Sequence, residues 1–177
     1  MPYVYAQSKD CTQRGLPMMR ALFVEFPNDP GAWQIENQYM FGADILVAPL
    51  LEEGIFSRNI YLPIGNWIDY QTGISYIGGA WHKIDATHLP VIMLVKDGAV
   101  IPHIHLAQST AMMDWSNIDL VAFSTAAATA KGKIFLPTDT QLSEITLSKK
   151  ASKWTLTNDP YKGKTKLKLF SFTDYPH

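Results

Sequence analysis

Short apolar segments, separated by turn residues, follow one another through most of the chain after residue 31. Glycines at Gly65, Gly73 and Gly78 interrupt the first of them, and a turn at Asp97–Gly98 separates two more. Short strands between frequent turns are typical of antiparallel β-domains. We therefore predict a mainly β chain that forms an antiparallel β-sandwich. The predicted strands cover residues 58–63, 66–70, 74–77, 81–86, 91–97, 99–104, 118–124, 133–137, 143–148, 153–158 and 166–172.

The stretch QYMFGADILVAPLLEEG, residues 38–54, contains an uncharged apolar run from Ile45 to Leu51 between acidic neighbours. An apolar run of strand length is buried on both of its faces. Successive side chains of a strand point to opposite sides, so Ile45 and Val47 lie opposite Leu46. Pro49 cannot donate a backbone hydrogen bond, which places an edge or a bulge at the end of this strand. The run is therefore predicted to be core.

The first 27 residues follow a different pattern, a helix and then a strand, which is typical of α/β architecture. Pro2 suits a first helical turn, and Gly15 and Pro17 end the helix. The apolar run MMRALFVEF, Met18–Phe26, is predicted to be a buried strand that ends in the turn PNDPG. The helical register places these residues on one predicted face: Val4, Tyr5, Ser8, Cys11 and Thr12.

Composition limits the class of protein. The chain has 177 residues, of which 47% are hydrophobic and 18% are charged, so it has ample material for a folded core. A net charge of −1 provides no field that would recruit nucleic acid or an anionic membrane. No apolar run approaches the roughly 20 residues of a membrane span, and residues 1–13 lack the features of a signal peptide. The single cysteine, Cys11, excludes an internal disulfide.

The acidic residues form no recognisable catalytic pair. Glycoside hydrolysis requires two carboxylates on either side of the scissile bond. Glu52 and Glu53 are adjacent, so in an extended chain they point to opposite faces. Glu25 and Asp29 bracket a turn, where surface and turn roles are more common. We assign no catalytic residue to this chain.

Metal and cofactor sites receive no assignment either. His103 and His105 are two residues apart and would share one face of a strand, but they have no evident third ligand. The glycines of YIGGAW lack the lysine and the strand-to-helix context of a phosphate loop. At the C-terminal end, Lys164, Lys166 and Lys168 alternate with less polar residues, which predicts a solvated strand face. We predict no metal, no cofactor and no nucleic-acid partner.

Tryptophans offer the main candidate for ligand binding, because an aromatic plane packs on the C–H face of a sugar ring. Trp33, Trp67, Trp81 and Trp115 all lie near turns. Large aromatic side chains are more often core in a β-domain, so both interpretations remain open.

Five segments occur in a fixed order: GLPMMRALFVEFPND, QYMFGADILVAPLLEEG, RNIYLPIGNWIDYQTG, a GG pair and LPVIMLVKDGAVIP. This order resembles the C-terminal portion of glycoside hydrolase family 31, which contains α-glucosidases and α-xylosidases. The resemblance is collinear from about Tyr3 to Pro102 and thins beyond Ala111. The AWHK sequence at 80–83 resembles the α-xylosidase branch.

The resemblance implies a domain layout. Residues 1–37 would be the end of a (β/α)8 catalytic barrel, with its last helix and its eighth strand at Met18–Phe26. Residues 38–111 would form a proximal C-terminal β-domain and residues 112–177 a distal one. The fold class would then be mainly β, preceded by a short α/β remnant of the barrel.

The resemblance also implies that the catalytic aspartates of the family lie on earlier barrel strands, outside every segment that matches here. Arg20 matches the family's MR at the eighth strand, and Asp29 matches its FP-x-D. We interpret both as residues that order the end of the barrel. A buried arginine needs an ion-pair partner, and Glu25 or Asp29 is the expected one.

We therefore interpret the chain as the C-terminal fragment of a retaining α-glycosidase that hydrolyses terminal α-linked glucose or xylose. Its expected partners are the remainder of the barrel and the oligosaccharide substrate of the parent enzyme. Exposed apolar surface would also favour homo-oligomers. The alternative is a carbohydrate-binding or interaction β-sandwich module that uses Trp67 or Trp81. A third interpretation is a purely structural β-domain without a ligand.

Overall fold

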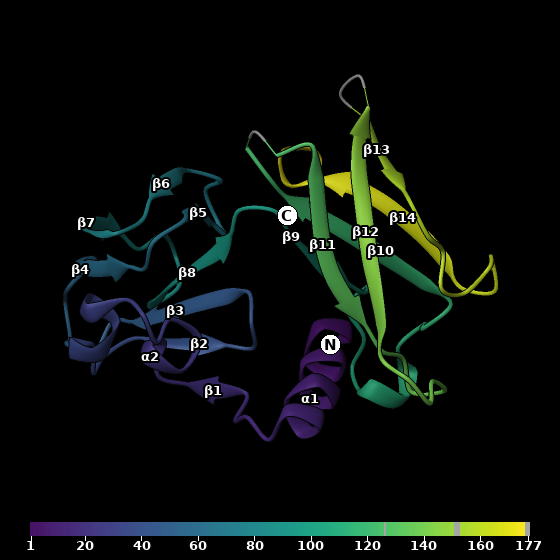
Figure 1. Ribbon diagram of the computed structural model, residues 1–177, viewed down its shortest axis with the longest axis horizontal. Helices are drawn as coiled ribbons and strands as arrows, with labels where there is room; N and C mark the ends of the chain where they lie inside the picture. Colours follow the sequence, from purple (N-terminus) through teal and green to yellow (C-terminus); the bar gives the residue numbers. More distant parts are fainter. Residues whose placement is uncertain (126, 151–152, 176–177) are drawn as a thin grey trace. The chain divides into compact units, whose positions relative to one another are not determined.

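The computed structural model describes residues 1–125, 127–150 and 153–175 (Figure 1). The chain divides into two compact units, one made of residues 1–15 and 98–177 and the other of residues 16–97. Strands dominate both units, so the prediction of a mainly β chain is confirmed. Within these ranges, no helix combines the length and the apolarity needed to cross a bilayer. The predicted division at residues 37 and 111 stays a prediction.

The unit 16–97 contains a six-stranded sheet and a two-stranded sheet in which every pair of strands is antiparallel. The six-stranded sheet has the order β1 (Met19–Arg20), β2 (Tyr39–Phe41), β3 (Ile45–Pro49), β8 (Val91–Lys96), β5 (Asn66–Asp69) and β6 (Ser75–Ile77). The smaller sheet pairs β4 (Ser57–Leu62) with β7 (Ala80–Asp85).

The apolar run predicted to be core forms β3, which lies between β2 and β8. Leu46 pairs with Met40 on one side and with Leu94 on the other, and all three side chains are fully buried. Ile45 to Ala48 are buried without interruption, so the prediction of burial on both faces is confirmed. Pro49 is the last residue of the strand.

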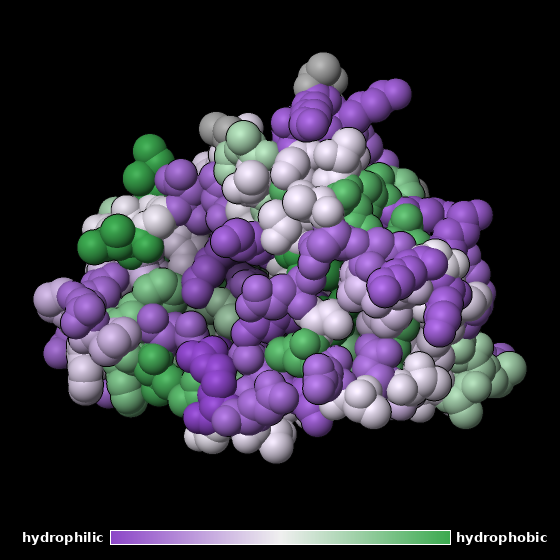
Figure 2. Space-filling model, turned by 45° about the vertical axis from the view of Figure 1, so that its right-hand side comes forward, coloured by the Kyte–Doolittle hydropathy of each residue, from purple (hydrophilic) through white to green (hydrophobic). Residues whose placement is uncertain are grey.

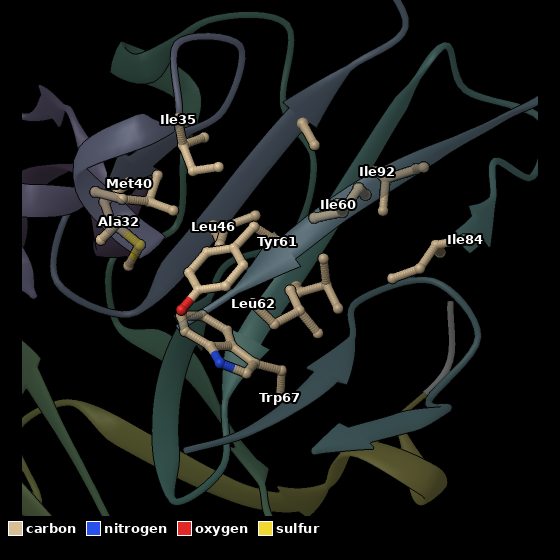
Figure 3. Close-up of a cluster of buried hydrophobic side chains, with 13 residues drawn as sticks. Ala32, Ile35, Met40, Leu46, Ile60, Tyr61, Leu62, Trp67, Ile84 and Ile92 are labelled. Atoms are coloured by element: carbon tan, nitrogen blue, oxygen red, sulfur yellow. The ribbon is translucent and has the colours of Figure 1, made fainter. Parts of the chain in front are cut away.

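One hydrophobic core joins the two sheets of this unit (Figure 3). Ile60 and Leu62 of β4 and Ile84 of β7 belong to the same buried cluster as Leu46 and Trp67 of the larger sheet. Trp67 is 1% exposed, and its indole N–H donates to the Pro63 carbonyl at 2.8 Å. The small sheet therefore covers one face of the large one.

The prediction of a strand over Met18–Phe26 is wrong for most of this segment. Only Met19 and Arg20 are extended, as β1, and Leu22–Glu25 form the short helix α2. The Phe26 N–H donates to the Leu22 carbonyl at 2.9 Å, and the helical turn buries Leu22 while Phe23 stays 37% exposed. A short apolar run has the same pattern in a buried strand and in a buried helical turn, which explains the error. A one-and-a-half-turn 3-10 helix, η1 (Pro30–Gln34), follows.

The unit made of residues 1–15 and 98–177 contains the helix α1 (Pro2–Arg14) and a curved mixed sheet. The sheet has the order β13 (Lys153–Leu156), β12 (Ser143–Lys150), β11 (Thr129–Ile134), β9 (Ala99–His103), β10 (Asn117–Phe123) and β14 (Lys166–Ser171). Its two edge strands approach one another, because Trp154 of β13 donates to Ser171 Oγ of β14 at 3.2 Å. Short 3-10 helices span Thr110–Met112 (η2) and Phe172–Asp174 (η3).

This sheet differs from the fully antiparallel arrangement predicted from the sequence. The β10–β14 and β9–β11 pairs are parallel, because β14 and β11 follow crossover connections rather than tight hairpins. Lys166 and Lys168 are exposed on the edge strand β14, whereas Leu167 and Leu169 pack against the core. The predicted solvated lysine face is therefore confirmed.

The helix α1 ends where the sequence predicts, at Gly15, whose φ of 67° and N–H bond to the Cys11 carbonyl form a left-handed cap. Of the residues that the sequence places on one face, only Cys11 is buried. The residues that are buried are Pro2, Tyr3, Ala6, Gln7, Asp10 and Cys11. Asp10 is buried because its carboxylate pairs with Lys133 of β11 at 2.6 Å, a partner that no local pattern reveals.

Candidate functional site

An open groove of about 440 Å³ follows β1, β2 and the end of β3 in the unit 16–97. Arg20, Tyr39 and Pro49 line it, together with the exposed residues Met19 and Leu51. Since β1 is the edge strand of the sheet, the groove lies where a further strand or segment could pack.

Arg20 is buried beside this groove and is paired as predicted. Its Nη2 lies 2.5 Å from Glu25 Oε1, and its Nη1 donates to the Pro17 carbonyl at 2.9 Å. Lys96 Nζ lies 3.8 Å from the second oxygen of Glu25 and 4.8 Å from the centre of the Phe26 ring. One carboxylate therefore balances two cations and connects β1, α2 and β8. The expected ion pair of Arg20 with Glu25 is confirmed.

Asp29 has different partners. Its carboxylate accepts hydrogen bonds from the Tyr61 hydroxyl at 2.6 Å and from the Gly31 N–H at 3.0 Å. Burial, followed by the Asp29 carboxylate, raises the pKa of Tyr61 to about 12. The Gln38 side chain binds both backbone groups of Tyr61, at 2.8 and 2.9 Å. These buried bonds attach the 27–38 segment to β4.

Glu25 and Asp29 thus have structural partners, whereas Glu36, which lines the groove, is exposed. Glu25 is ion-paired, and Asp29 holds a tyrosine hydroxyl and a backbone amide. Glu52 and Glu53 are exposed in the loop after β3. The expectation that this chain carries no catalytic pair stays a prediction.

The two histidines proposed as a weak metal pair do not share a strand. His103 is the last residue of β9, and its ring packs edge-on against Tyr175 at 4.8 Å. His105 lies beyond the end of the strand. Among the described residues, no group of three or more His, Cys, Asp or Glu side chains is arranged to hold a metal ion.

The helical face that the sequence register picks out lines a second open groove, of about 330 Å³. Val4, Tyr5 and Thr12 of the helix line it together with Phe135. The Lys9 ammonium lies 5.3 Å from the centre of the Phe135 ring. This groove carries no cluster of titratable groups and no evident chemistry.

The structure separates the tryptophans into buried and exposed ones. Trp67 is core, so its proposed role as a sugar-binding aromatic is wrong. Trp115 is half-buried, with its ring centre 5.1 Å from that of Tyr5. Trp33 and Trp81 are 56% and 59% exposed. On the face drawn in Figure 2, exposed hydrophobic residues form small separate groups among hydrophilic ones.

Phe23 was not singled out in the sequence, yet it forms the support for Trp33. The two rings stack with centres 4.7 Å apart and an interplanar angle of 16°. One sequence signal could have indicated that Phe23 is exposed. Phe23 lies a few residues before a proline-rich turn, and a helical turn at that place directs one apolar side chain outwards.

Residues 15–101 match the sequence profile of the glycosyl hydrolase family 31 C-terminal domain. An isomaltosyltransferase of Sporosarcina globispora is 37% identical over 58% of this chain and 9% of its own length. Alpha-glucosidase 2 of Bacillus thermoamyloliquefaciens is 33% identical over 64% of this chain and 14% of its own. An alpha-xylosidase of Saccharolobus solfataricus is 31% identical over 68% and 17%.

Among solved structures, a GH31 dextranase of Flavobacterium johnsoniae aligns with a TM-score of 0.71 and 27% identity. The alignment covers 84% of this chain and 20% of the dextranase. The chain thus spans between 9% and 17% of the length of the three curated relatives and a fifth of the structural neighbour.

Proposed function

Because the chain belongs to glycosyl hydrolase family 31 through its residues 15–101, we propose that it is the C-terminal portion of a retaining α-glycosidase. The parent enzyme would hydrolyse terminal α-linked glucose or xylose from oligosaccharides through a covalent glycosyl-enzyme intermediate. The observation that carries this proposal is the extent of the match, 84% of this chain against 20% of a dextranase. The chain corresponds to one part of such an enzyme, and that part holds no assigned catalytic pair.

In this proposal, residues 1–37 complete the catalytic barrel, and β-sandwich domains formed by the rest of the chain support it. The supporting features are local to β1. It is an edge strand, the groove of about 440 Å³ runs beside it, and Arg20 and Glu25 fix its direction. A rigid edge of this kind is suited to receive the remainder of the barrel, which is the proposed partner of the chain.

Two measurements test this function. The purified 177-residue chain is assayed on chromogenic α-glucoside and α-xyloside over several pH values, and no turnover above buffer is expected. In a chimaera, this chain replaces the matching segment of the Bacillus alpha-glucosidase 2, and we expect turnover to be retained with the anomeric configuration of the product unchanged. Turnover by the isolated chain that is abolished by changing one of its acids would overturn the proposal.

The second candidate is a carbohydrate-binding or interaction module. The specific observation in its favour is that two tryptophans of the unit 16–97 are more than half exposed, whereas Trp67, the other residue considered for this role, is buried. This candidate predicts retention of the chain on an α-glucan or xyloglucan matrix. A purely structural β-domain predicts none.

A further inference from the structure

We propose that the outer face of the Trp33 indole is a binding platform for a pyranose ring of an oligosaccharide. One face of the indole is stacked on Phe23, at 4.7 Å between ring centres and 16° between ring planes. The indole N–H donates to the Pro27 carbonyl at 3.0 Å. Trp33 is still 56% exposed, and with one face covered by Phe23 we assign the accessible area to the opposite face.

These two contacts fix the orientation of the ring before any ligand arrives. The indole N–H has its hydrogen bond within the protein, so binding on the open face leaves no polar group of Trp33 unsatisfied. A side chain that is already held in one rotamer loses little entropy on binding. An exposed tryptophan without a binding role would not require both the stacking on Phe23 and the hydrogen bond to the Pro27 carbonyl.

The backbone that carries Trp33 is also held firmly. The 3-10 helix η1 starts after Asp29, whose carboxylate accepts from the Gly31 N–H and the Tyr61 hydroxyl. Gly31 packs directly on the Tyr61 ring, where a Cβ atom would collide with the ring carbons. The segment that carries Trp33 is therefore held against the core strand β4 by the contacts of Asp29 and Gly31 with Tyr61.

The polar groups around the platform suit a neutral, hydroxyl-rich ligand. Asn28 directly follows Pro27, the residue that accepts the indole N–H, and Gln34 directly follows Trp33; both are exposed. Their amide groups can donate to and accept from sugar hydroxyls, while the aromatic plane packs on the axial C–H groups of the ring. Trp33, Asn28 and Gln34 carry no charge, and the carboxylate of Asp29 is engaged by the Gly31 N–H and the Tyr61 hydroxyl, so the aromatic plane is the main recognition element.

Glucose- and xylose-configured rings have equatorial hydroxyls and an apolar C–H face. Their choice as ligands rests on the proposed function, whereas the platform itself rests on the geometry of Trp33. If no sugar binds, the chimaera described above still tests the glycosidase proposal independently.

Trp81 offers a matched control. It is 59% exposed and lies in the same unit, but its ring is tilted by 60° against Tyr61 at 5.6 Å and has no parallel ring behind it among its described contacts. If any exposed tryptophan bound sugar, Trp81→Ala and Trp33→Ala would have equal effects. If the supported ring is the platform, only Trp33→Ala removes binding.

The experiment is native affinity electrophoresis of the 177-residue chain through gels that contain dextran or xyloglucan, compared with gels that contain neither. We expect at least one polysaccharide to retard the wild type and Trp81→Ala. Trp33→Ala should weaken binding by about tenfold or more, the change that corresponds to the loss of one aromatic stacking contact. Trp33→Phe, which keeps an aromatic face, should retain part of the retardation.

Saturation-transfer NMR on the wild type with isomaltotriose and xylose provides a measurement that needs no variant. Transfer concentrated on the axial C–H protons of one sugar face is the expected result. The proposal is overturned if neither polysaccharide retards the wild type and no transfer is seen. It is also overturned if folded Trp33→Ala binds as well as the wild type, or if a dimer of the wild type that Trp33→Ala abolishes accounts for the retardation.

Discussion

Arg20 and Glu25 form a buried ion pair, with Nη2 and Oε1 2.5 Å apart, across the bend between β1 and α2. Both residues of the pair lie in the segment Met18–Phe26, which the sequence predicted to be one continuous strand. The Arg20 side chain is fully buried, so its charge has no access to water and depends on this carboxylate.

Replacing Arg20 with leucine should strongly destabilise the unit 16–97. The substitution leaves Glu25 largely buried with only the more distant Lys96, and breaking a buried ion pair costs about 3 to 5 kcal/mol of the free energy of unfolding. Urea unfolding, followed by circular dichroism, measures this change.

The matched control is Arg14→Ala, which removes an arginine that is 47% exposed and lies 3.4 Å from Asp10. Because the arginine of this pair is exposed, the pair contributes no more than about 1 kcal/mol. The double variant Arg20→Leu, Glu25→Leu should recover part of the loss, because the buried Glu25 charge is removed and the Lys96 side chain that loses its carboxylate is 31% exposed. Equal losses for Arg20→Leu and Arg14→Ala would contradict the role given to the buried pair.

The pH dependence of the other unit should depend on Asp10. Burial alone would raise the pKa of Asp10, but the hydrogen bond and charge of Lys133, and then Arg14, lower it below its ordinary value. A carboxyl whose pKa is lower in the folded state stabilises that state above the unfolded pKa and loses this contribution as the pH falls through the folded one. The loss is therefore expected below about pH 4.

Asp10→Asn tests this expectation. At neutral pH the variant should be less stable by on the order of 1 to 3 kcal/mol, the contribution of a hydrogen bond to a charged group. The difference from the wild type should shrink as the pH falls from 5 to 2, because the wild type loses the same interaction by protonation. A difference that stays constant over this range would show that the charge of Asp10 does not matter.

Comparison of these segments with their sequence patterns shows where sequence reasoning succeeds. The strand β3 was predictable because a long uncharged run has few alternatives. The partner of Arg20 could be narrowed to Glu25 or Asp29 because both acids are close to it in the sequence. The segment Met18–Phe26 was not predictable, since a short apolar run fits a strand and a helical turn equally well. In both correct predictions the determining residues are close together in the sequence.

Long-range contacts account for the remaining errors. The buried face of α1 includes Asp10, whose partner Lys133 lies 123 residues away, and hydrophobicity alone places an aspartate outside. Likewise, Trp67 and Trp81 occupy similar positions beside glycine turns, yet one is core and the other exposed. Trp67 belongs to the buried cluster between the two sheets, whereas Trp81 lies on the exposed side of β7, and this difference depends on the pairing of distant strands.

Cys11 should report whether α1 is attached to its unit. The thiol is 5% exposed and is the only one in the chain, so a thiol reagent should label the native protein slowly and the urea-unfolded protein fast. Tyr3→Ala removes a large buried side chain from the same face of α1 and should accelerate labelling by about tenfold or more, since about 2 kcal/mol or more of burial is lost. Labelling kinetics monitored by absorbance provide the measurement.

The control for this experiment is Thr12→Ala, on the exposed side of the same helix. It should leave the labelling rate within about twofold of the wild type, because surface substitutions change stability by about 0.5 kcal/mol or less. Fast labelling of the wild type under native conditions would contradict the burial of this face.

Tyr61 should make the chain sensitive to alkali. Burial and then the Asp29 carboxylate raise its pKa from 10.0 to about 12, so the native state holds the proton more tightly than the unfolded state. A group with a raised folded pKa contributes stability that is complete below the unfolded pKa and is lost as the pH rises through the folded one. The stability of the wild type should therefore decline between pH 10 and about 12.

Tyr61→Phe should separate the two effects of the hydroxyl. At pH 8 the variant should be less stable by about 1 to 2 kcal/mol, because buried Asp29 loses the donor at 2.6 Å. Above pH 10 its stability should decline less steeply than that of the wild type. Part of the decline should remain, because burial also raises the pKa of Tyr76, Tyr161 and Tyr175. Parallel curves of stability against pH for the two proteins would show that the Tyr61 hydroxyl titrates as it does in the unfolded chain, and the Asp29 contact would lose its assigned role.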